Sequence, residues 1–358
     1  MSGSSLDGLD LCLASISESD QGWQYRIEKA RTIELPDKMV VRLRESAELN
    51  DTDLQTLDLD YGIWIGSSVN AFKIGLKHNI DFVAVHGHTV FHHPEKGISK
   101  QLGRGDMIAN HCQLPVIDDF RIDDILKGGQ GAPLVPVGEM LLFHGFDGFV
   151  NLGGIANLSV IRGKQIRAWD LCPCNQVLNF FASKKGHSYD QNGEIARHGH
   201  FDSNWFNELM VLEFFALSPP KSLSNQWGKQ NILKNIPINW NDGLHTYAQL
   251  ISEIICRDIL AHTKAGAKIL FTGGGAFNTF LMELIQLKSL GKFETVIPDN
   301  NLISFKEALI FGFLGLLKML DRPNVYATVT GAFEDSCAGK IHFPKNNFSI
   351  LNSANPSL

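Results

Sequence analysis

The chain lacks an excess of positive charge, a long apolar run and any regular cysteine spacing. Its net charge of −6 over 358 residues argues against nucleic acid or an anionic membrane as a partner, since both need a basic surface. Apolar runs stay below the roughly 20 residues that span a bilayer, and the longest, 308–320, has the length of a buried helix. Because the six cysteines form no CxxC pair, we expect free, reduced thiols in a cytoplasmic protein.

What the sequence does contain is an alternation of strand-like and helix-like segments, which predicts α/β layers. A chain of 358 residues is long for one hydrophobic core and suits two domains, with a boundary near residues 144–147. The expected strands are 9–14, 23–27, 80–85, 114–117, 148–151, 158–161, 165–169, 268–271 and 295–297. The expected helices are 51–77, 107–112, 175–183, 247–263, 279–287 and 305–320.

Two similar turns lie about half the chain apart. Residues 2–8 are rich in serine and glycine and lead into the strand 9–14, and residues 151–157 follow the strand 148–150 with amides and glycines. Turns of small residues leave successive backbone N–H groups free to point at one anion, which is how proteins hold phosphate. One such turn in each half suggests a nucleotide clamped between two related domains.

A third glycine turn, residues 272–278, connects a buried strand to a helix. Three successive glycines allow a ligand to approach the backbone, although a tight strand–helix connection explains them about as well. The sequence contains no GxxxxGK[ST] loop and no GxGxxG that opens a βαβ unit with a later acid, so a P-loop or Rossmann site is disfavoured.

Asp170 follows the expected strand 165–169 and precedes a helix that opens at Asn175. A carboxylate at the end of a strand in an α/β fold faces the edge where ligands bind, and this place suits a general base. A helix-capping or turn aspartate is the commoner role at such positions, so spacing alone favours the structural interpretation.

Charged residues also gather before the glycine loop 128–133. Four acids surround Arg121 and could bind a sugar or a metal-bound phosphate, but a solvated helix-capping cluster has the same pattern: Asp118, Asp119, Asp123 and Asp124. The histidines at 86, 88, 92 and 93 have no acid or cysteine placed to complete a metal shell, so substrate hydrogen bonding is the more plausible role.

Together these motifs resemble those of the anhydro-N-acetylmuramic acid kinase family. Residues 2–10 are similar to the family's opening turn, and the GGQGAPLVP string at 128–136 is highly specific for the family, whereas the glycine turns alone are not. The other similar segments follow in the family's order: 86–89 with Pro94, 119–128, 151–157, 170–175 and 272–278. The resemblance covers the chain from Met1 to about residue 320.

The resemblance implies an α/β fold of two duplicated ribonuclease H-like domains of the actin/hexokinase type, with a nucleotide cleft between them. We expect the domains at 1–147 and 148–330, and a C-terminal segment, 331–358, that packs back on the first domain. The sequence opens on the first turn, without the strand that precedes this turn in the family, so we expect either that the start of the gene is placed late or that the first domain lacks this edge.

The resemblance further implies an ATP-dependent kinase of peptidoglycan recycling that acts with Mg²⁺, is cytoplasmic and forms a homodimer. It would open 1,6-anhydro-N-acetylmuramic acid with water and phosphorylate its 6-oxygen, giving N-acetylmuramate 6-phosphate and ADP. Deprotonation of water for attack on an anomeric carbon is the chemistry of an inverting glycosidase base.

By resemblance Asp170 is that base, and His86, Arg121 and Glu307 belong to the substrate pocket. Asp7 or Asp10 would reach magnesium, directly or through water. The residues implied for nucleotide binding are Gly3, Ser4, Ser5, Leu6, Asp7, Gly8, Asp10, Gly153, Gly154, Gly273, Gly274 and Gly275.

Some positions depart from the family's pattern. Cys172-Pro173-Cys174 replaces two glycines after the expected base, so this loop would sit differently, and His88, Asn179, Gln226 and the stretch 137–139 also differ. Two alternatives follow: another sugar kinase of the same superfamily, or a non-catalytic actin-like ATP-binding protein.

Overall fold

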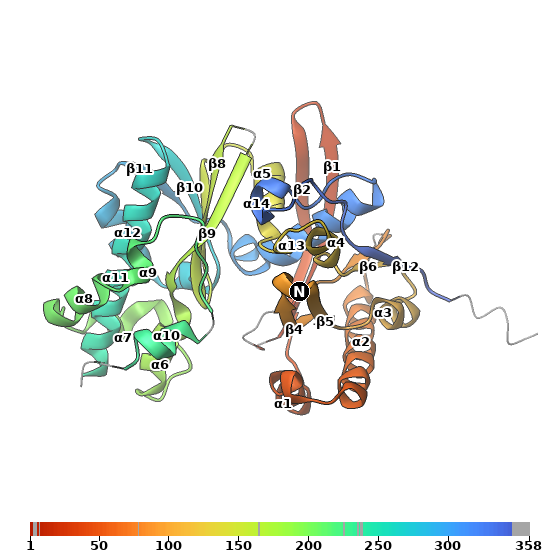
Figure 1. The fold of residues 1–358 in the computed structure, drawn as a ribbon, viewed down its shortest axis with the longest axis horizontal. Coiled ribbons are helices and arrows are strands. Elements are labelled where there is room, and N and C mark those ends of the chain that lie inside the picture. Colours follow the sequence, from red (N-terminus) through yellow and green to blue (C-terminus); the bar gives the residue numbers. More distant parts are fainter. Residues whose placement is uncertain are drawn as a thin grey trace, which may run out of the picture. The chain divides into compact units, whose positions relative to one another are not determined.

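The computed structural model describes residues 1–345 except 3–5, 7, 78, 164, 225, 235, 237 and 238. This part of the chain is a mixed α/β structure that divides into two compact units (Figure 1). Unit 1 contains Met1–Gly138 and the chain from Glu307 onward, and unit 2 contains Glu139–Lys306. Unit 2 is therefore one uninterrupted segment, whereas unit 1 is built from two.

Unit 2 is built on a five-stranded sheet with the order β11-β10-β7-β8-β9. The strands β7, β8 and β9 form an antiparallel meander, and β10 and β11 continue the sheet in parallel to β7. Its elements are β7 Gly148–Leu152, β8 Ile155–Arg162, β9 Gln165–Pro173, α6 Asn175–Ser183, α7 Glu194–Arg197, α8 Ser203–Met210, α9 Glu213–Ala216, α10 Trp227–Asn231, α11 Trp240–His262, β10 Ala267–Thr272, α12 Thr279–Ser289 and β11 Phe293–Val296.

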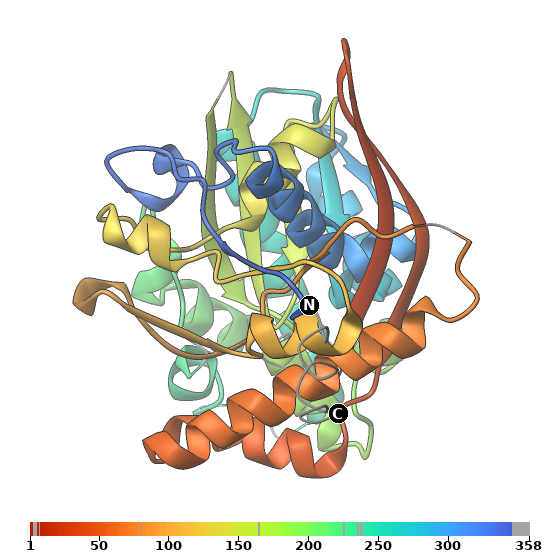
Figure 2. The ribbon, with the colours of Figure 1, turned by 90° about the vertical axis from the view of Figure 1, so that its right-hand side faces the viewer.

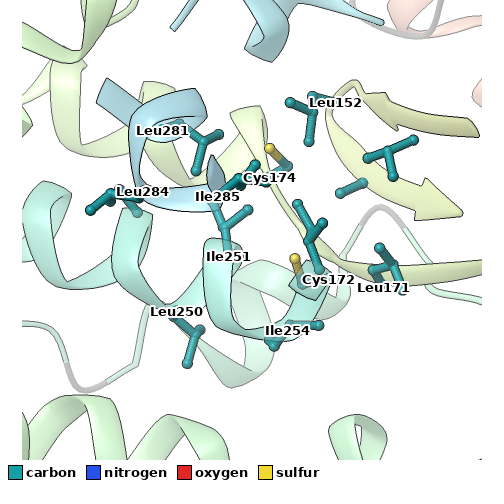
Figure 3. Packing of buried hydrophobic residues seen from close by; sticks show 14 of the residues in the cluster. Leu152, Leu171, Cys172, Cys174, Leu250, Ile251, Ile254, Leu281, Leu284 and Ile285 are labelled. Carbon is teal, nitrogen blue, oxygen red and sulfur yellow. The ribbon is translucent and has the colours of Figure 1, made fainter. Parts of the chain in front are cut away.

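The core of unit 2 forms where α11 and α12 bring their apolar side chains to the sheet (Figure 3). Ile251 and Ile254 of α11 and Ile285 of α12 pack in one buried cluster with Leu152 and Leu171 of the sheet. The long helix α11 begins at Asn239, whose side chain accepts a hydrogen bond from the backbone N–H of Asn241. Burial of such side chains contributes about 1.5–3 kcal/mol each, which fixes the helices on the sheet.

Unit 1 has its strands in separate groups, namely a ribbon of β1 and β2, a sheet with the order β12-β6-β3, and a hairpin of β4 and β5. Figure 2 shows the β1–β2 ribbon along its length. The elements of unit 1 are β1 Leu9–Ser19, β2 Gly22–Ile33, α1 Asp37–Arg44, α2 Asp51–Lys73, β3 Val83–Ala84, β4 His88–His93, β5 Ile98–Leu102, α3 Gly105–Cys112, β6 Val116–Asp118, α4 Ile122–Leu126, α14 Ala327–Thr330 and β12 Lys340–His342.

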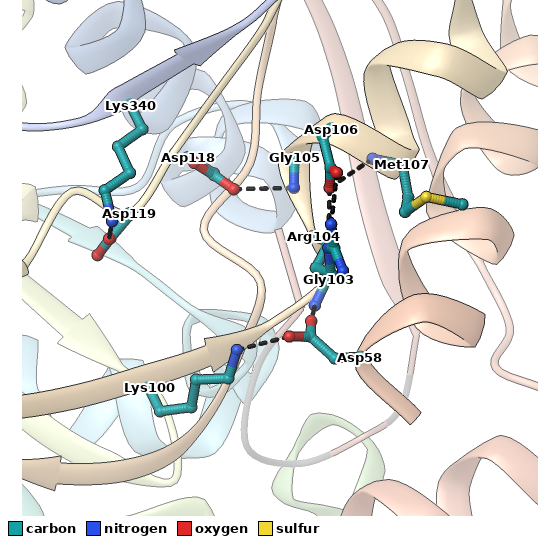
Figure 4. Close-up of polar contacts among 10 residues, drawn as sticks. All are labelled: Asp58, Lys100, Gly103, Arg104, Gly105, Asp106, Met107, Asp118, Asp119 and Lys340. Atoms are coloured by element: carbon teal, nitrogen blue, oxygen red, sulfur yellow. Dashed lines mark hydrogen bonds and ion pairs between the residues drawn. The ribbon is translucent and has the colours of Figure 1, made fainter. Parts of the chain in front are cut away.

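The connection from β5 to α3 is fixed by two buried or half-buried carboxylates (Figure 4). Asp58 of α2 accepts hydrogen bonds from the N–H of Gly103 at 2.7 Å and from Lys100 at 2.5 Å. Asp118, at the end of β6, accepts from the N–H of Gly105 at 2.9 Å, where α3 begins. These bonds connect α2, α3 and β6, and they thereby fix the position of the end of β6, from which the chain continues to residue 121.

The observed units differ from the expected division at 147 and 330. Two helices, α5 Val135–Leu142 and α13 Asn300–Met319, pass from one unit to the other. A side chain at Gly138 would lie 2.5 Å from Ile310, so the two helices pack closely on the unit 1 side. A helix has no break in its hydrophobic pattern where it changes unit, and for that reason the sequence carries no boundary signal there.

The expected elements are present with shifted ends, and α6 has the expected bounds. The expected strand 9–14 is longer than predicted, because β1 continues through the polar segment 15–19, which a solvated two-stranded ribbon accepts. Asp170 does not end its strand, since β9 continues to Pro173.

Candidate functional site

The glycine turns of unit 2 meet at the ends of β7 and β10. The carbonyl of Gly153 accepts a hydrogen bond from the N–H of Asn175 at 3.1 Å, and that of Gly154 accepts from Cys174 at 2.8 Å. The side chain of Asn175 donates to the carbonyl of Leu152 at 2.8 Å. The turn between β7 and β8 is therefore held against the first residues of α6.

The turn after β10 packs against the end of β7, next to the β7–β8 turn. A Cβ at Gly273, which has a φ of +82°, would lie 2.6 Å from the Asn151 side chain, and one at Gly275 would lie 2.7 Å from Leu152. Gly274 differs, because its Cβ position has only the Asn175 side chain near it, at 3.6 Å. Glycine is thus required twice for packing, and at Gly274 it leaves backbone open to a ligand.

This cluster of Gly153, Gly154 and Gly273–Gly275, the glycine cluster, has the chemistry of an anion site. It lies where the ends of two parallel strands meet the beginning of α6, whose own first N–H groups already donate to the carbonyls of Gly153, Gly154 and Cys174. Next to it the hydroxyl of Thr272 is buried and has no hydrogen-bond partner within the described chain. A phosphate group fits backbone of this kind because it accepts several N–H bonds at once.

Asp170 lies on β9 of the same unit, half-buried and next to the segment 221–223. One carboxylate oxygen accepts from the N–H of Leu223 at 2.8 Å, and the Asp170 N–H donates to the carbonyl of Lys221 at 3.0 Å. Burial raises the pKa of the Asp170 carboxyl, and the bond from Leu223 opposes this shift. The residue before α6 is Cys174, so Asp170 caps no helix and the structural interpretation as an N-cap is wrong.

The unusual Cys172-Pro173-Cys174 segment is part of the core. Both thiols are fully buried (Figure 3), and burial raises the pKa of Cys174 to about 12. The carbonyl of Pro173 accepts from the hydroxyl of Tyr247 at 2.7 Å. All six cysteines are free, as expected, and these two fill space instead of binding a ligand.

A second polar cluster lies in unit 1 and joins residues that are far apart in the sequence. Arg121 donates to His86 Nε2, at 2.7 Å from Nη2 and 3.2 Å from Nε, and to the carbonyl of Gly131 at 2.6 Å. His86 Nδ1 lies 2.9 Å from the carbonyl of Gly87, which fixes the tautomer with the proton on Nδ1. Burial and the Arg121 charge lower the pKa of His86 to about 3, so the ring is neutral.

Glu307 completes this cluster. Burial lowers the pKa of Arg121 to about 10, and the negative charge of Glu307 opposes that shift. The ring of Phe311, one turn further along α13, contacts His86 edge-on at 4.8 Å. The structure therefore brings together His86, Arg121 and Glu307, the residues expected in a substrate pocket.

The acids around Arg121 have internal partners. Asp124 is fully buried and accepts from the Gly131 N–H at 2.7 Å and from the Thr330 hydroxyl at 2.6 Å. Asp123 accepts from the Gly339 N–H at 3.1 Å, and Asp119 pairs with Lys340 at 2.7 Å. These carboxylates hold the glycine loop and β12 in place, which favours the structural interpretation of the cluster.

The first turn is described only in part. The expected residues Gly3, Ser4, Ser5 and Asp7 lie outside the described residues, whereas Leu6 is buried with a φ of +57°. Gly8 is needed for close packing, since a Cβ there would lie 2.5 Å from Thr32. Asp10 accepts from the Thr32 hydroxyl at 2.6 Å. Within the described chain no three acids, histidines or cysteines are placed to hold a metal ion.

Sequence reasoning missed the partners that orient the expected residues. Leu223 acts on Asp170 through its backbone N–H, and Thr330 reaches Asp124 from more than 200 residues away. A backbone donor carries no side-chain signature, so no motif points to Leu223. Thr330 is an ordinary hydroxyl in the sequence and gains its meaning only from the fold.

A mixed α/β protein with a glycine cluster at its strand ends and a carboxylate of raised pKa in the same unit has the features of a phosphate-handling enzyme. The sequence profile of the anhydro-N-acetylmuramic acid kinase family matches residues 1–344, and the chain belongs to this family. The resemblance drawn from the motifs is thereby confirmed, as is an enzyme of the kinase class.

Proteins named anhydro-N-acetylmuramic acid kinase are similar over most of the chain. One from Francisella tularensis subsp. novicida is 30% identical over 375 residues, covering 96% of this chain and 97% of the relative. One from Hydrogenovibrio crunogenus is 29% identical, with 96% and 97% covered.

Among solved structures, the activator of the 2-hydroxyisocaproyl-CoA dehydratase from Clostridium difficile with bound ADPNP gives a TM-score of 0.38 at 13% identity, covering 84% of this chain and 96% of the other. In the described part, no helix combines the length and apolar character needed to cross a membrane.

Proposed function

We propose that the protein uses ATP to open 1,6-anhydro-N-acetylmuramic acid with water and to phosphorylate its 6-oxygen. The observation that carries the mechanism is Asp170, whose carboxylate is oriented by the N–H of Leu223 and whose pKa is raised by burial. A raised pKa makes a carboxylate a stronger base. The names of the relatives support this substrate.

The chemical step balances with one base. Asp170 takes a proton from water, the water oxygen forms a bond to the anomeric carbon, and the bond between that carbon and the 6-oxygen breaks. The released 6-oxygen takes the γ-phosphoryl group, and ADP leaves. No acid is needed for the leaving oxygen, because it forms its new bond to the γ-phosphorus instead of taking a proton; transfer itself depends on positioning and charge.

The remaining residues bind and orient. The glycine cluster of unit 2 supplies N–H groups for ATP, and the first turn, with Asp7 and Asp10, supplies carboxylates of the kind that magnesium prefers, directly or through water. Magnesium, when bound, neutralises charge on the phosphates. Arg121 and Glu307 hydrogen-bond the sugar, and His86 keeps Arg121 in position. The family resemblance supports a homodimer in the cytoplasm; light scattering of the purified protein tests the dimer.

The test is release of ADP that depends on the anhydro-sugar, run in ¹⁸O-water. We expect ¹⁸O at the anomeric carbon and none in the phosphate. Asp170→Asn should lower kcat by about 10²–10⁴-fold, the range for a lost general base, while sugar binding is kept. Asp147→Asn is the matched control, since Asp147 is also half-buried and accepts a backbone N–H, from Lys268 at 2.9 Å.

Each other outcome has a meaning. Folded protein that leaves the anhydro-sugar unchanged but phosphorylates a free hexose is another sugar kinase. ATP binding without turnover of any sugar indicates a non-catalytic protein. Full activity of Asp170→Asn removes Asp170 as the base.

A further inference from the structure

The segment 217–224 of unit 2, described throughout, follows α9 and forms neither a helix nor a strand. It contacts Asp170 at two points: the Asp170 N–H donates to the carbonyl of Lys221 at 3.0 Å, and the Asp170 carboxylate accepts from the N–H of Leu223 at 2.8 Å. A segment without regular backbone bonding of its own opens easily unless its side chains hold it. The orientation of Asp170 therefore depends on what holds residues 221–223.

Lys221 is the buried residue of this segment, whereas its neighbours Ser222 and Ser224 are exposed. Its side chain reaches back to α9, where Nζ makes a long hydrogen bond of 3.5 Å to the carbonyl of Phe214. Nζ also lies 5.0 Å from the centre of the Phe214 ring, within the range of a cation–π contact. The ammonium thus connects the segment to the core of unit 2.

A fixed carboxylate attracts this ammonium. Burial lowers the pKa of Lys221, the negative charge of Asp258 on α11 opposes that shift, and Arg257 and Cys172 are the other titratable groups that act on it. Asp258 is buried and accepts hydrogen bonds from Trp169 Nε1 at 3.1 Å and from Arg257 at 3.2 Å. Because β9 and α11 both hold Asp258, its charge draws Lys221 toward one place in the core.

Packing alone does not account for a lysine at this position. Burying an ammonium costs free energy unless it is well hydrogen-bonded, and the described contacts of Nζ are one distant carbonyl and one ring face. An apolar side chain of similar length would fill the same space at a lower cost. What the charge adds is direction, because its attraction to Asp258 and to the Phe214 carbonyl sets where residue 221 lies.

We propose that Lys221 is a positioning residue for Asp170: it anchors residues 221–223 on the core of unit 2 and thereby keeps the N–H of Leu223 on the carboxylate. The proposal rests on the role of Asp170 as the base in the proposed function. The bond from Leu223 occupies one carboxylate oxygen, and a base needs only the other to take a proton from water. Lys221 itself takes no part in the proton transfer.

The test is Lys221→Met, which removes the ammonium and keeps most of the side-chain length. We expect amide exchange at Leu223 to become about tenfold faster or more, because its hydrogen bond opens more often. The pKa of the Asp170 carboxyl, followed by ¹³C NMR, should rise, since the bond from Leu223 holds it down. Both readouts are taken without substrate.

The kinetics should change in the same variant. We expect kcat to fall about tenfold through lost orientation of the base, with the KM for the sugar within about twofold of the wild type. The acid limb of the kcat profile should move to higher pH, because a carboxyl of higher pKa ionises at higher pH. Cys172 also lies within the electrostatic reach of Asp170, but burial raises the pKa of its thiol well above the usual range, so it does not produce this limb.

Two variants serve as controls. Arg257→Met also removes a cation that donates to a carbonyl of α9, that of Phe215 at 2.7 Å, and it should leave the exchange of Leu223 and the acid limb unchanged. Lys221→Arg keeps a cation above Phe214 and should keep kcat within about threefold of the wild type. A stabilising role without positioning would give similar effects in Lys221→Met and Arg257→Met.

Each other outcome is decisive. Wild-type exchange at Leu223 and a wild-type Asp170 pKa in Lys221→Met overturn the proposal, as do equal changes in Arg257→Met. Where Lys221→Met does not fold, Asp258→Asn replaces it, since it removes the charge that acts on Lys221 and keeps an acceptor for Trp169. Faster exchange at Leu223 in that variant supports the proposal, and an unchanged rate overturns it. Full activity of Asp170→Asn refutes the proposed function separately.

Discussion

Replacement of Asp124 by alanine should destabilise unit 1 and weaken sugar binding together. The carboxylate is fully buried and accepts two hydrogen bonds, from the Gly131 N–H and the Thr330 hydroxyl. Hydrogen bonds to a charged group contribute about 1.5–3 kcal/mol each. In the variant, the Thr330 hydroxyl can still donate to the Tyr326 carbonyl, which lies 3.4 Å from it in the structure. The free energy lost with the Thr330 bond is therefore at the low end of this range. We therefore expect a total loss of about 3–5 kcal/mol.

The effect on the site follows from Gly131. Its N–H is held by Asp124, and its carbonyl accepts from Arg121 at 2.6 Å, so release of this loop removes one oriented bond from Arg121. A loss of about 1.4 kcal/mol at Arg121 corresponds to a tenfold rise in the KM for the sugar.

The assay is urea unfolding followed by steady-state kinetics at a temperature where the variant stays folded. Asp123→Ala is the matched control: this neighbouring acid accepts one backbone bond, at 3.1 Å from the Gly339 N–H, and should cost less than about 1.5 kcal/mol. Equal unfolding free energies for the two variants would refute the assignment of Asp124 as the anchor of the glycine loop. A destabilised variant with an unchanged KM would refute its link to Arg121.

Two further predictions concern ionised groups. Glu139 and Lys306 form a buried ion pair at 2.5 Å, so Lys306→Met alone should lower the free energy of unfolding by about 3–5 kcal/mol. The double variant Glu139→Leu with Lys306→Met should restore the wild-type urea midpoint, and equal midpoints for the single and double variants would contradict this. The carboxylate of Asp118 raises the pKa of His342 above its usual 6.5, so the protonated ring stabilises the fold at low pH and this contribution disappears as pH rises through the raised pKa. The melting temperature of the wild type should therefore exceed that of His342→Gln most at pH 6 and approach it by pH 9, and a pH-independent difference would exclude the ion pair as its cause.

Much of the fold follows from local pattern. The helix α6 has its expected bounds because its apolar residues repeat at helical spacing and a proline stands just before its start. The hairpin β4–β5 was missed, since the sequence from His88 to His93 carries three histidines in place of a clear alternation of apolar and polar residues. The change of unit within α13 was also missed, because only tertiary packing decides it.

For the candidate site, too, some features could be predicted from the sequence and others could not. The sequence pointed to Asp170 through its place between an expected strand and an expected helix, and to Arg121 through the surrounding acids and the glycine loop 128–133; the roles of both residues stay predictions. What could not be predicted is how each is held, since Leu223 acts through its backbone and His86 reaches Arg121 across 35 residues of chain. Sequence motifs indicate which side chains are candidates for the chemistry, whereas the hydrogen bonds that orient them depend on the tertiary structure.

The two-part construction of unit 1 has a consequence for the order in which the protein forms during synthesis. Unit 2 is one stretch and can fold once residue 306 has left the ribosome, whereas unit 1 must wait for α13 and β12. His342 of β12 follows its partner Asp118 by 224 residues. At a translation rate of about 5–20 residues per second, the edge of β6 that β12 covers stays open for about 10–45 s. The half that begins first is completed last, so the nascent chain has its greatest need of protection from aggregation at β6.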